Sequence, residues 1–217
     1  MIILIRIYKF DNYFIKMNYY IPIIPIKIIM LGELNVGKTS LLKKYCKNNQ
    51  EILFYTNLSH ISTLKIKNGV RFEITLSDTA GQEKYKSLSS IYFKGVKIVI
   101  LVYSIDNEKS FKELDNWLKL VKTNIDSNLI IFGVIANKSD LASETTISNE
   151  RGINYAKKIG GYFKSTCAIN EDNDFEEFID ELFNKYYENK LDIEAESNST
   201  LNRGMIRYST VGRNSCC

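Results

Sequence analysis

The sequence predicts one α/β domain with a mostly parallel, six-stranded sheet, one antiparallel edge strand and helices on both faces. From about residue 26, short apolar runs alternate with segments whose apolar residues recur at helical spacing, which is typical of strands joined by crossover helices. Two of the runs are joined by Asn68-Gly69, a dipeptide that favours a tight hairpin. The length of 217 residues suits one such domain with extensions rather than two domains.

Local patterns give the individual elements of this domain. Apolar runs of strand length predict strands at residues 26–31, 58–66, 70–77, 97–103, 129–135 and 162–166. Apolar residues at helical spacing predict helices at residues 38–48, 109–124, 148–159 and 175–189. The domain is therefore expected to span residues 26–189.

Two segments lie outside the predicted domain. Residues 1–25 are rich in Ile and Tyr and end in Pro22 and Pro25, which suit an extended lead-in to the first strand. We interpret this extension either as a mis-set start, with Met17 as the true initiator, or as an apolar arm that packs on the domain or a membrane. Residues 190–217 are rich in Asn, Ser and Thr, which predicts a flexible tail.

Composition excludes several classes of protein. The net charge of +4 is small and dispersed, which argues against a nucleic-acid partner. Charged residues interrupt the Ile-rich start, so no window of about 18 apolar residues predicts a membrane-spanning helix. The four cysteines show neither a disulfide framework nor a metal-binding pair, which fits a reducing, cytosolic setting.

A phosphate-binding motif follows the first predicted strand and opens the first predicted helix. It is the octet Gly32, Glu33, Leu34, Asn35, Val36, Gly37, Lys38 and Thr39. The two glycines let the backbone curl so that its N–H groups face phosphate oxygens, and the helix N-terminus adds positive potential. Lys38 is expected to contact the β- and γ-phosphates, and the Thr39 hydroxyl to bind Mg²⁺.

A second motif indicates which base is bound. Asn137-Lys138-Ser139-Asp140 follows a buried strand at the carboxyl edge of the sheet, where ligands bind in such folds. The Asp140 carboxylate can accept from guanine N1–H and the 2-amino group, whereas adenine offers neither donor there. Asn137 is expected to pin the loop and contact the base, and the Lys138 stem to cover the ring. Asp140 thus argues against the alternative of an ATP-using kinase or transporter subunit.

The third motif, Asp78-Thr79-Ala80-Gly81-Gln82-Glu83, follows the second strand of the hairpin. Asp78 is expected to hold Mg²⁺ through water, and the Gly81 N–H to reach the γ-phosphate. Gln82 is placed to orient the attacking water as the catalytic residue. Glycine at position 81 allows a backbone change that depends on the γ-phosphate, so we expect this loop to move.

These three motifs, in this order and spacing, resemble the small GTPases of the Ras superfamily, and most closely the Rab family. The likeness continues in residues 82–87, 91–96, 101–106 and 110–118. The resemblance implies the Ras-like P-loop NTPase fold and a GTP/GDP switch in vesicle-mediated membrane traffic. It also implies that Thr166, Cys167 and Ala168 close over guanine, the last through its backbone N–H.

The same resemblance implies the partners of the protein. They are an exchange factor, a GTPase-activating protein, effectors and a GDP-dissociation inhibitor. The protein would then lie on the cytoplasmic face of a membrane, lipid-anchored, with a cytosolic pool. Hydrolysis of GTP would be slow until a partner helps.

The sequence departs from the family pattern at three positions. The switch I threonine of the family lies about 18 residues after the hydroxyl that binds Mg²⁺, whereas Thr56 lies 17 residues after Thr39. We still expect Thr56 to be the switch I ligand of Mg²⁺ and the γ-phosphate. Ser77 replaces the family tryptophan before the third motif, which indicates an unusual set of partners. Leu34 crowds the space that Gln82 and a partner's arginine need in the transition state, so we expect impaired hydrolysis. The alternative function is therefore a hydrolysis-deficient, nucleotide-bound scaffold.

The chain ends in Cys216-Cys217, and the Rab resemblance implies geranylgeranyl groups on both. The acidic and basic residues of segment 191–217 cancel, so no basic patch helps to hold an anionic membrane. One lipid chain without such help binds marginally, whereas two give a stable anchor. We therefore expect attachment to the membrane through two prenyl groups.

Overall fold

The computed structural model describes the backbone of residues 4–10, 13–19, 22–48, 52–56, 60–78, 92–125, 129–144 and 147–210. Side-chain surroundings are described for residues 22–47, 60–78, 92–125, 129–142 and 147–193.

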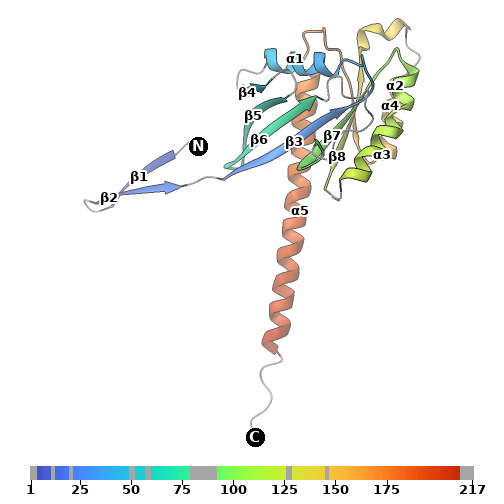
Figure 1. The fold of residues 1–217 in the computed structure, drawn as a ribbon. Coiled ribbons are helices and arrows are strands. Elements are labelled where there is room, and N and C mark those ends of the chain that lie inside the picture. The colour runs from blue at the N-terminus through green and yellow to red at the C-terminus, as the bar shows by residue number, and fades with distance from the viewer. Residues whose placement is uncertain are drawn as a thin grey trace.

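The centre of the molecule is a seven-stranded sheet in the order β4-β5-β6-β3-β7-β8-β9 (Figure 1). The strands in this order are Ile52–Thr56, His60–Lys67, Val70–Asp78, Ile23–Leu31, Val96–Ser104, Ile131–Asn137 and Tyr162–Ser165. β5 is antiparallel to both neighbours, and the remaining pairs are parallel. The predicted fold class and its six strands are confirmed, and the short strand β4 is added at the edge.

A separate two-stranded sheet precedes the domain. It pairs β1 (Leu4–Phe10) with β2 (Tyr13–Tyr19) in antiparallel register. Both interpretations of this segment, a mis-set start and an apolar arm that packs on the domain or a membrane, stay predictions.

Helices follow the predicted pattern with two differences. They are α1 (Lys38–Asn48), α2 (Glu108–Lys112), α3 (Leu114–Asn124), α4 (Asn149–Lys158) and α5 (Asp174–Thr210), with a 3-10 helix, η3, at Ser139–Glu144. The predicted helix over residues 109–124 is divided at Glu113, which ends α2 and precedes α3.

The second difference concerns the segment that the sequence predicts to be a flexible tail from residue 190. α5 instead continues as helix to Thr210. The chain has no proline after Pro25 that would stop it, and Leu191, Ala195 and the nearby glutamates are good helix formers. The boundary of the domain at residue 189 stays a prediction.

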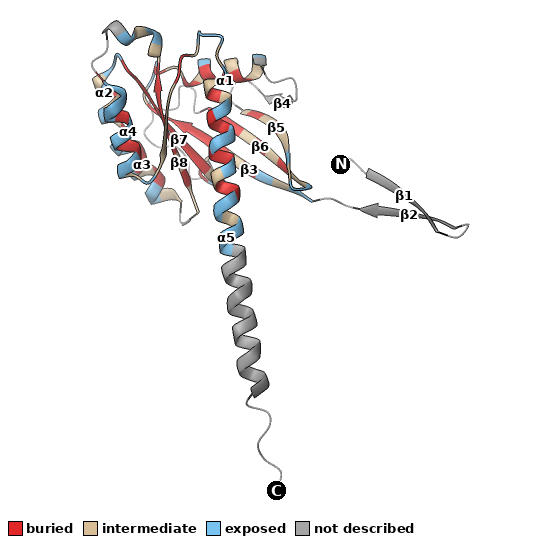
Figure 2. Cartoon of the chain, turned by 180° about the vertical axis from the view of Figure 1, so that it is seen from behind, coloured by how far each residue is buried: buried red, intermediate tan, exposed pale blue. Residues whose placement is uncertain are grey.

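Helices cover the two faces of the sheet and enclose two cores. Alternate residues of β3 separate them, with Ile28 and Met30 in the first core and Ile29 and Leu31 in the second. The first core lies under α1 and α5, and the second under α2, α3 and α4 (Figure 1). Buried residues accordingly concentrate in the central strands and on the sheet-facing sides of these helices (Figure 2).

The register of the strands brings the motifs to one edge of the sheet. Met30 of β3 pairs with Asp78 of β6, and Ser104 of β7 pairs with Asn137 of β8. The loops that follow these parallel strands therefore leave the sheet side by side. Ligands bind at such an edge in open α/β sheets.

Candidate functional site

The phosphate loop connects the end of β3 to the start of α1 at Lys38. A Cβ atom on Gly32 would lie 2.1 Å from the Val102 carbonyl oxygen, closer than any real contact. A Cβ atom on Gly37, where φ is +93°, would lie 2.2 Å from Asn137 Nδ2. Both positions therefore need glycine because neighbouring segments pass too close for a side chain.

The loop is folded around the ammonium group of Lys38. Its Nζ donates to the carbonyl oxygens of Gly32 at 2.8 Å and Glu33 at 2.9 Å, and the residue is only 5% exposed. Asn35 adopts a left-handed φ of 63°, Val36 is buried and Leu34 is 37% exposed. A positive charge is thus held over the curled backbone at the helix N-terminus, which suits an anionic ligand.

Thr39 and Asp78 bring together two oxygen atoms that can act as metal ligands. The Thr39 hydroxyl donates to Asp78 Oδ2, and Asp78 is 3% exposed at the end of β6. Hydroxyl and carboxylate oxygens are the donors that Mg²⁺ prefers. The residues present therefore fit the predicted Mg²⁺ position next to the phosphate loop.

Asn137 links the first motif to the segment expected to close over the base. Its Nδ2 donates to the Val36 carbonyl oxygen at 2.8 Å, and its Oδ1 accepts from the Thr166 hydroxyl at 3.3 Å. Asn137 and Thr166 are both buried. Three segments that are far apart in the sequence are thus held together by one amide side chain.

Lys138 follows with a left-handed φ of 64° and is paired with Asp106, whose Oδ2 lies 3.6 Å from Lys138 Nζ. Asp106 also accepts from the Ser104 hydroxyl. That hydrogen bond, and then the Lys138 charge, lower the pKa of Asp106 from its ordinary value. Asp106 stays ionised at neutral pH and holds the Lys138 stem beside the loop, a role that sequence reasoning missed.

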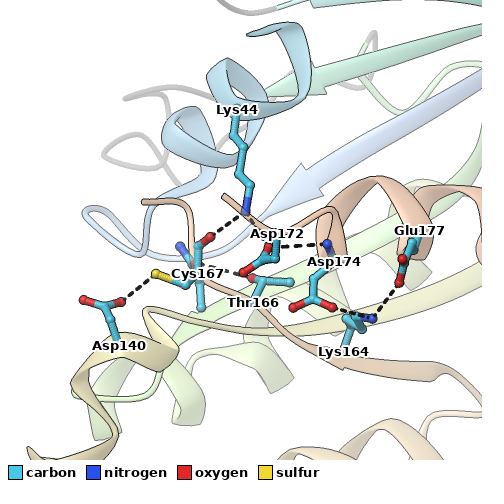
Figure 3. A network of polar contacts seen from close by, with 9 residues as sticks. Lys44, Asp140, Lys164, Thr166, Cys167, Asp172, Asp174 and Glu177 are labelled. Atoms are coloured by element: carbon cyan, nitrogen blue, oxygen red, sulfur yellow. Dashed lines mark hydrogen bonds and ion pairs between the residues drawn. The ribbon is translucent and has the colours of Figure 1, made fainter. Parts of the chain in front are cut away.

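Asp140 is oriented by Cys167. The Cys167 thiol is buried and donates to Asp140 Oδ1 at 2.9 Å, whereas Asp140 itself is exposed (Figure 3). The Ser139 N–H donates to the Thr166 carbonyl oxygen at 3.1 Å, which joins the two loops again through the backbone. The structure thus brings the Asn137–Asp140 motif and Cys167 together, and their binding of a base stays a prediction.

Two further residues adjoin this region and were not identified from the sequence. Lys44 of α1 donates to the Cys167 carbonyl oxygen at 2.9 Å and to Asp172 Oδ1 at 2.6 Å. These partners lie 123 and 128 positions away, so local patterns carry no signal for them.

Several predicted residues lie beyond what the structure describes. Gly81, Gln82, Cys216 and Cys217 lie outside the described residues. Thr56 is placed only by its backbone, at the end of β4 opposite His60. Within the described part of the chain, no helix is both long and apolar enough to cross a membrane.

The fold and the site together define the class, a P-loop protein with a doubly wound α/β fold. The Ras family model matches residues 27–188, and the chain belongs to this family. The chain is 33% identical to Ras-related protein Rab-21 of Homo sapiens, over 83% of this chain and 81% of that protein. It is 31% identical to Rab11E of Lotus japonicus, over 72% and 74%, and 33% identical to Rab-3C of Bos taurus, over 75% and 73%. The chain is therefore a Rab-like GTPase of the Ras superfamily.

Proposed function

We propose that this Rab-like GTPase is a GTP/GDP switch that regulates vesicle-mediated membrane traffic. The observation that carries the proposal is the Asn137 side chain, which bonds to both Val36 of the phosphate loop and Thr166 of the base loop. One rigid link between these loops sets the distance between a phosphate site and a base site. A nucleotide is the ligand that needs both sites at once.

Selection of guanine rests on Asp140. Its carboxylate is held by the Cys167 thiol and otherwise faces solvent, so its second oxygen and remaining lone pairs are available to a base. Guanine supplies two donors to such a carboxylate. Adenine supplies none there, so binding of ATP would desolvate the carboxylate without compensation.

At the other end of the nucleotide, Lys38 would exchange its carbonyl partners, Gly32 and Glu33, for phosphate oxygens. Thr39 and Asp78 would hold Mg²⁺, with Thr56 as the further ligand from switch I. When bound, Mg²⁺ neutralises charge on the β- and γ-phosphates. The Gly81 N–H would contact the γ-phosphate, and Gln82 would orient the attacking water.

The Leu34 side chain favours an alternative function, in which the protein binds GTP but hydrolyses it very slowly. Its side chain is 37% exposed on the phosphate loop rather than packed in the core. In this position a leucine occupies space beside the γ-phosphate site and hinders Gln82 and an arginine from an activating protein. The second candidate function is therefore a nucleotide-bound scaffold that hydrolyses GTP very slowly.

The surface of the β5–β6 hairpin supports an unusual set of effectors. Ser77, which replaces the family tryptophan, is bonded to His60 with 2.8 Å between its hydroxyl and His60 Nδ1. Two pairs further along the register, the hydroxyls of Ser62 and Thr75 lie 3.1 Å apart. Ser77 itself is buried, so a partner would meet the half-buried side chains of His60, Ser62 and Thr75 instead of a large aromatic ring. The proposed exchange factor, activating protein and GDP-dissociation inhibitor would meet the same switch side of the molecule.

Membrane attachment is proposed through geranylgeranyl groups on Cys216 and Cys217 at the cytoplasmic face of a membrane. Intact mass of the protein from eukaryotic cells tests this part alone. Two added prenyl masses support it, and an unmodified chain contradicts it.

The main proposal is tested by nucleotide competition and turnover. A fluorescent GDP analogue bound to the full chain should be displaced by GTP but not by an equal concentration of ATP. Removal of Mg²⁺ with EDTA should accelerate its release. Equal displacement by ATP would contradict a GTP switch, and undetectable turnover with intact GTP binding would favour the scaffold.

A further inference from the structure

The carbonyl group of Cys167 is held by a lysine from another part of the fold. Lys44 projects from α1 and its ammonium donates to the Cys167 carbonyl oxygen at 2.9 Å (Figure 3). The same ammonium donates to Asp172 Oδ1 at 2.6 Å. Its side chain is 9% exposed and that of Asp172 is 33% exposed. Lys44 therefore makes a two-point, largely buried contact, unlike a solvated surface ion pair.

Asp172 is itself fixed in position. Its Oδ1 accepts from the Asp174 N–H at 3.4 Å, at the start of α5. Lys164 of β9 lies 2.8 Å from Asp174 Oδ1 and 3.4 Å from Glu177 Oε2, which ties the first turn of α5 to the sheet (Figure 3). The hydrogen bond from Lys44 also lowers the pKa of Asp172. Its carboxylate thus stays charged at neutral pH and anchors the ammonium.

Cys167 is therefore restrained on two sides. Its carbonyl is held by Lys44, and its thiol is bonded to Asp140. The preceding residue, Thr166, is already bonded through its N–H to the Ala136 carbonyl oxygen at 2.8 Å. One residue further on, Lys44 of α1 holds the Cys167 carbonyl. Without Lys44, Cys167 and the following Ala168 lose a restraint next to the base site.

We propose that Lys44 is a positioning residue for guanine recognition: by holding the Cys167 carbonyl it keeps the Cys167 thiol on Asp140 and the Ala168 backbone over the base. The inference rests on the proposed function of guanine-nucleotide binding. Both partners of Lys44 lie in segment 167–172, whereas Lys38 and Thr39 at the phosphates have partners of their own. Loss of Lys44 should therefore weaken base binding and leave the hydrolysis step unchanged.

A matched control comes from the same helix. Lys43 and Lys47 line, with Lys44, a hollow of about 690 Å³ between α1 and residues 168–171 and 173. Lys43 is exposed, and it carries the same charge one position away. If positive charge near the nucleotide were what matters, Lys43→Met would act as Lys44→Met does.

The experiment measures release of a fluorescent GDP analogue from the full chain in excess unlabelled GDP. Lys44→Met should accelerate release about tenfold, as expected for loss of hydrogen bonds from a charged group. Lys43→Met should stay within about twofold of the unsubstituted protein. Lys44→Arg should restore slow release, because a guanidinium can bond to both oxygens. Adding Asp172→Asn to Lys44→Met should cause no further acceleration, because the two residues act as one unit.

Two further readouts separate positioning from a general loss of structure. The preference for GDP over inosine diphosphate, which lacks the 2-amino group, should shrink in Lys44→Met. Single-turnover GTP hydrolysis in the loaded protein should keep its rate. If Lys44→Met does not fold, Asp172→Asn alone provides the same test.

The outcomes distinguish this inference from the function on which it rests. If the unsubstituted protein does not retain GDP, the proposed function fails. If it retains GDP and Lys44→Met releases it no faster than Lys43→Met, the positioning role is overturned. Acceleration with an unchanged preference for GDP over inosine diphosphate would also overturn it.

Discussion

Asn137 Nδ2 lies 2.8 Å from the Val36 carbonyl oxygen, a hydrogen bond that spans 101 positions of the chain. It joins the loop after β8 to the loop after β3. Both loops leave the same edge of the sheet, so the bond fixes one motif relative to the other. Asn137, which is expected to hold the base loop, thus also holds the phosphate loop in place through Val36.

Removal of this side chain should affect stability and binding together. Asn137→Ala leaves the Val36 carbonyl and the Thr166 hydroxyl without their partner in a buried site. The free energy of unfolding should fall by about 1–3 kcal/mol. Urea denaturation of the nucleotide-free protein measures this loss. Asn116→Ala is the control. The Asn116 side chain is exposed and donates to Glu113 Oε2 at the surface, so its loss should change stability by less than about 0.5 kcal/mol. Equal effects of the two variants would contradict a linking role for Asn137.

Base selectivity should follow the side chain at position 140. In Asp140→Asn the NH₂ group of the amide can donate to the 2-oxo group of xanthine. The amide has only one acceptor oxygen, so it can no longer accept from both guanine donors. Affinity for GTP should fall by about 100-fold and affinity for XTP should rise, as expected when a buried polar contact is left unpaired. Competition against a fluorescent GDP analogue measures both. An unchanged ratio of GTP to XTP affinity would show that Asp140 does not contact the base.

Hydrolysis should improve when the Leu34 side chain is reduced. Leu34→Ser removes the bulk from the phosphate loop without changing a core contact, since Leu34 is 37% exposed. Single-turnover GTP hydrolysis should accelerate by about tenfold, because Gln82 and the attacking water gain space. GDP affinity serves as the control and should change little. Equal hydrolysis rates in the two proteins would remove Leu34 as the cause of slow turnover.

The single histidine should make stability depend on pH in the mildly acidic range. Burial, and then the nearby Lys27 charge, lower the pKa of His60 from its ordinary value of 6.5, and Asp78 opposes this in part. Because the folded state holds the proton less tightly than the unfolded state, stability should be full above pH 6.5 and fall as the pH drops below it.

Two measurements check this behaviour of His60. NMR titration of its imidazole should give a pKa below 6.5. The pH dependence of thermal unfolding between about pH 7 and 5 should become weaker in His60→Gln, which keeps a hydrogen-bonding side chain beside Ser77. A slope that is the same in both proteins would assign the dependence to other groups.

Local patterns predicted much of the fold because each element depends on neighbouring residues. The six strands follow from apolar runs of strand length, and helix α1 follows from apolar residues at helical spacing. The same patterns did not reveal β4, which is a five-residue strand defined by its pairing with β5. They also predicted that the last helix ends near residue 189, whereas α5 continues to Thr210. A polar composition predicts a tail because it does not show whether the backbone continues as helix.

The sequence by itself determined the motifs of this protein: a phosphate loop, an Asp78 motif and an Asn137–Asp140 base motif, each within a short segment. Only the tertiary structure decided how they act on one another. Lys44, Cys167 and Asp172 meet because α1 and the β9–α5 loop lie together at the same edge of the sheet. Such contacts depend on the packing of elements more than 120 positions apart, for which residue spacing holds no information.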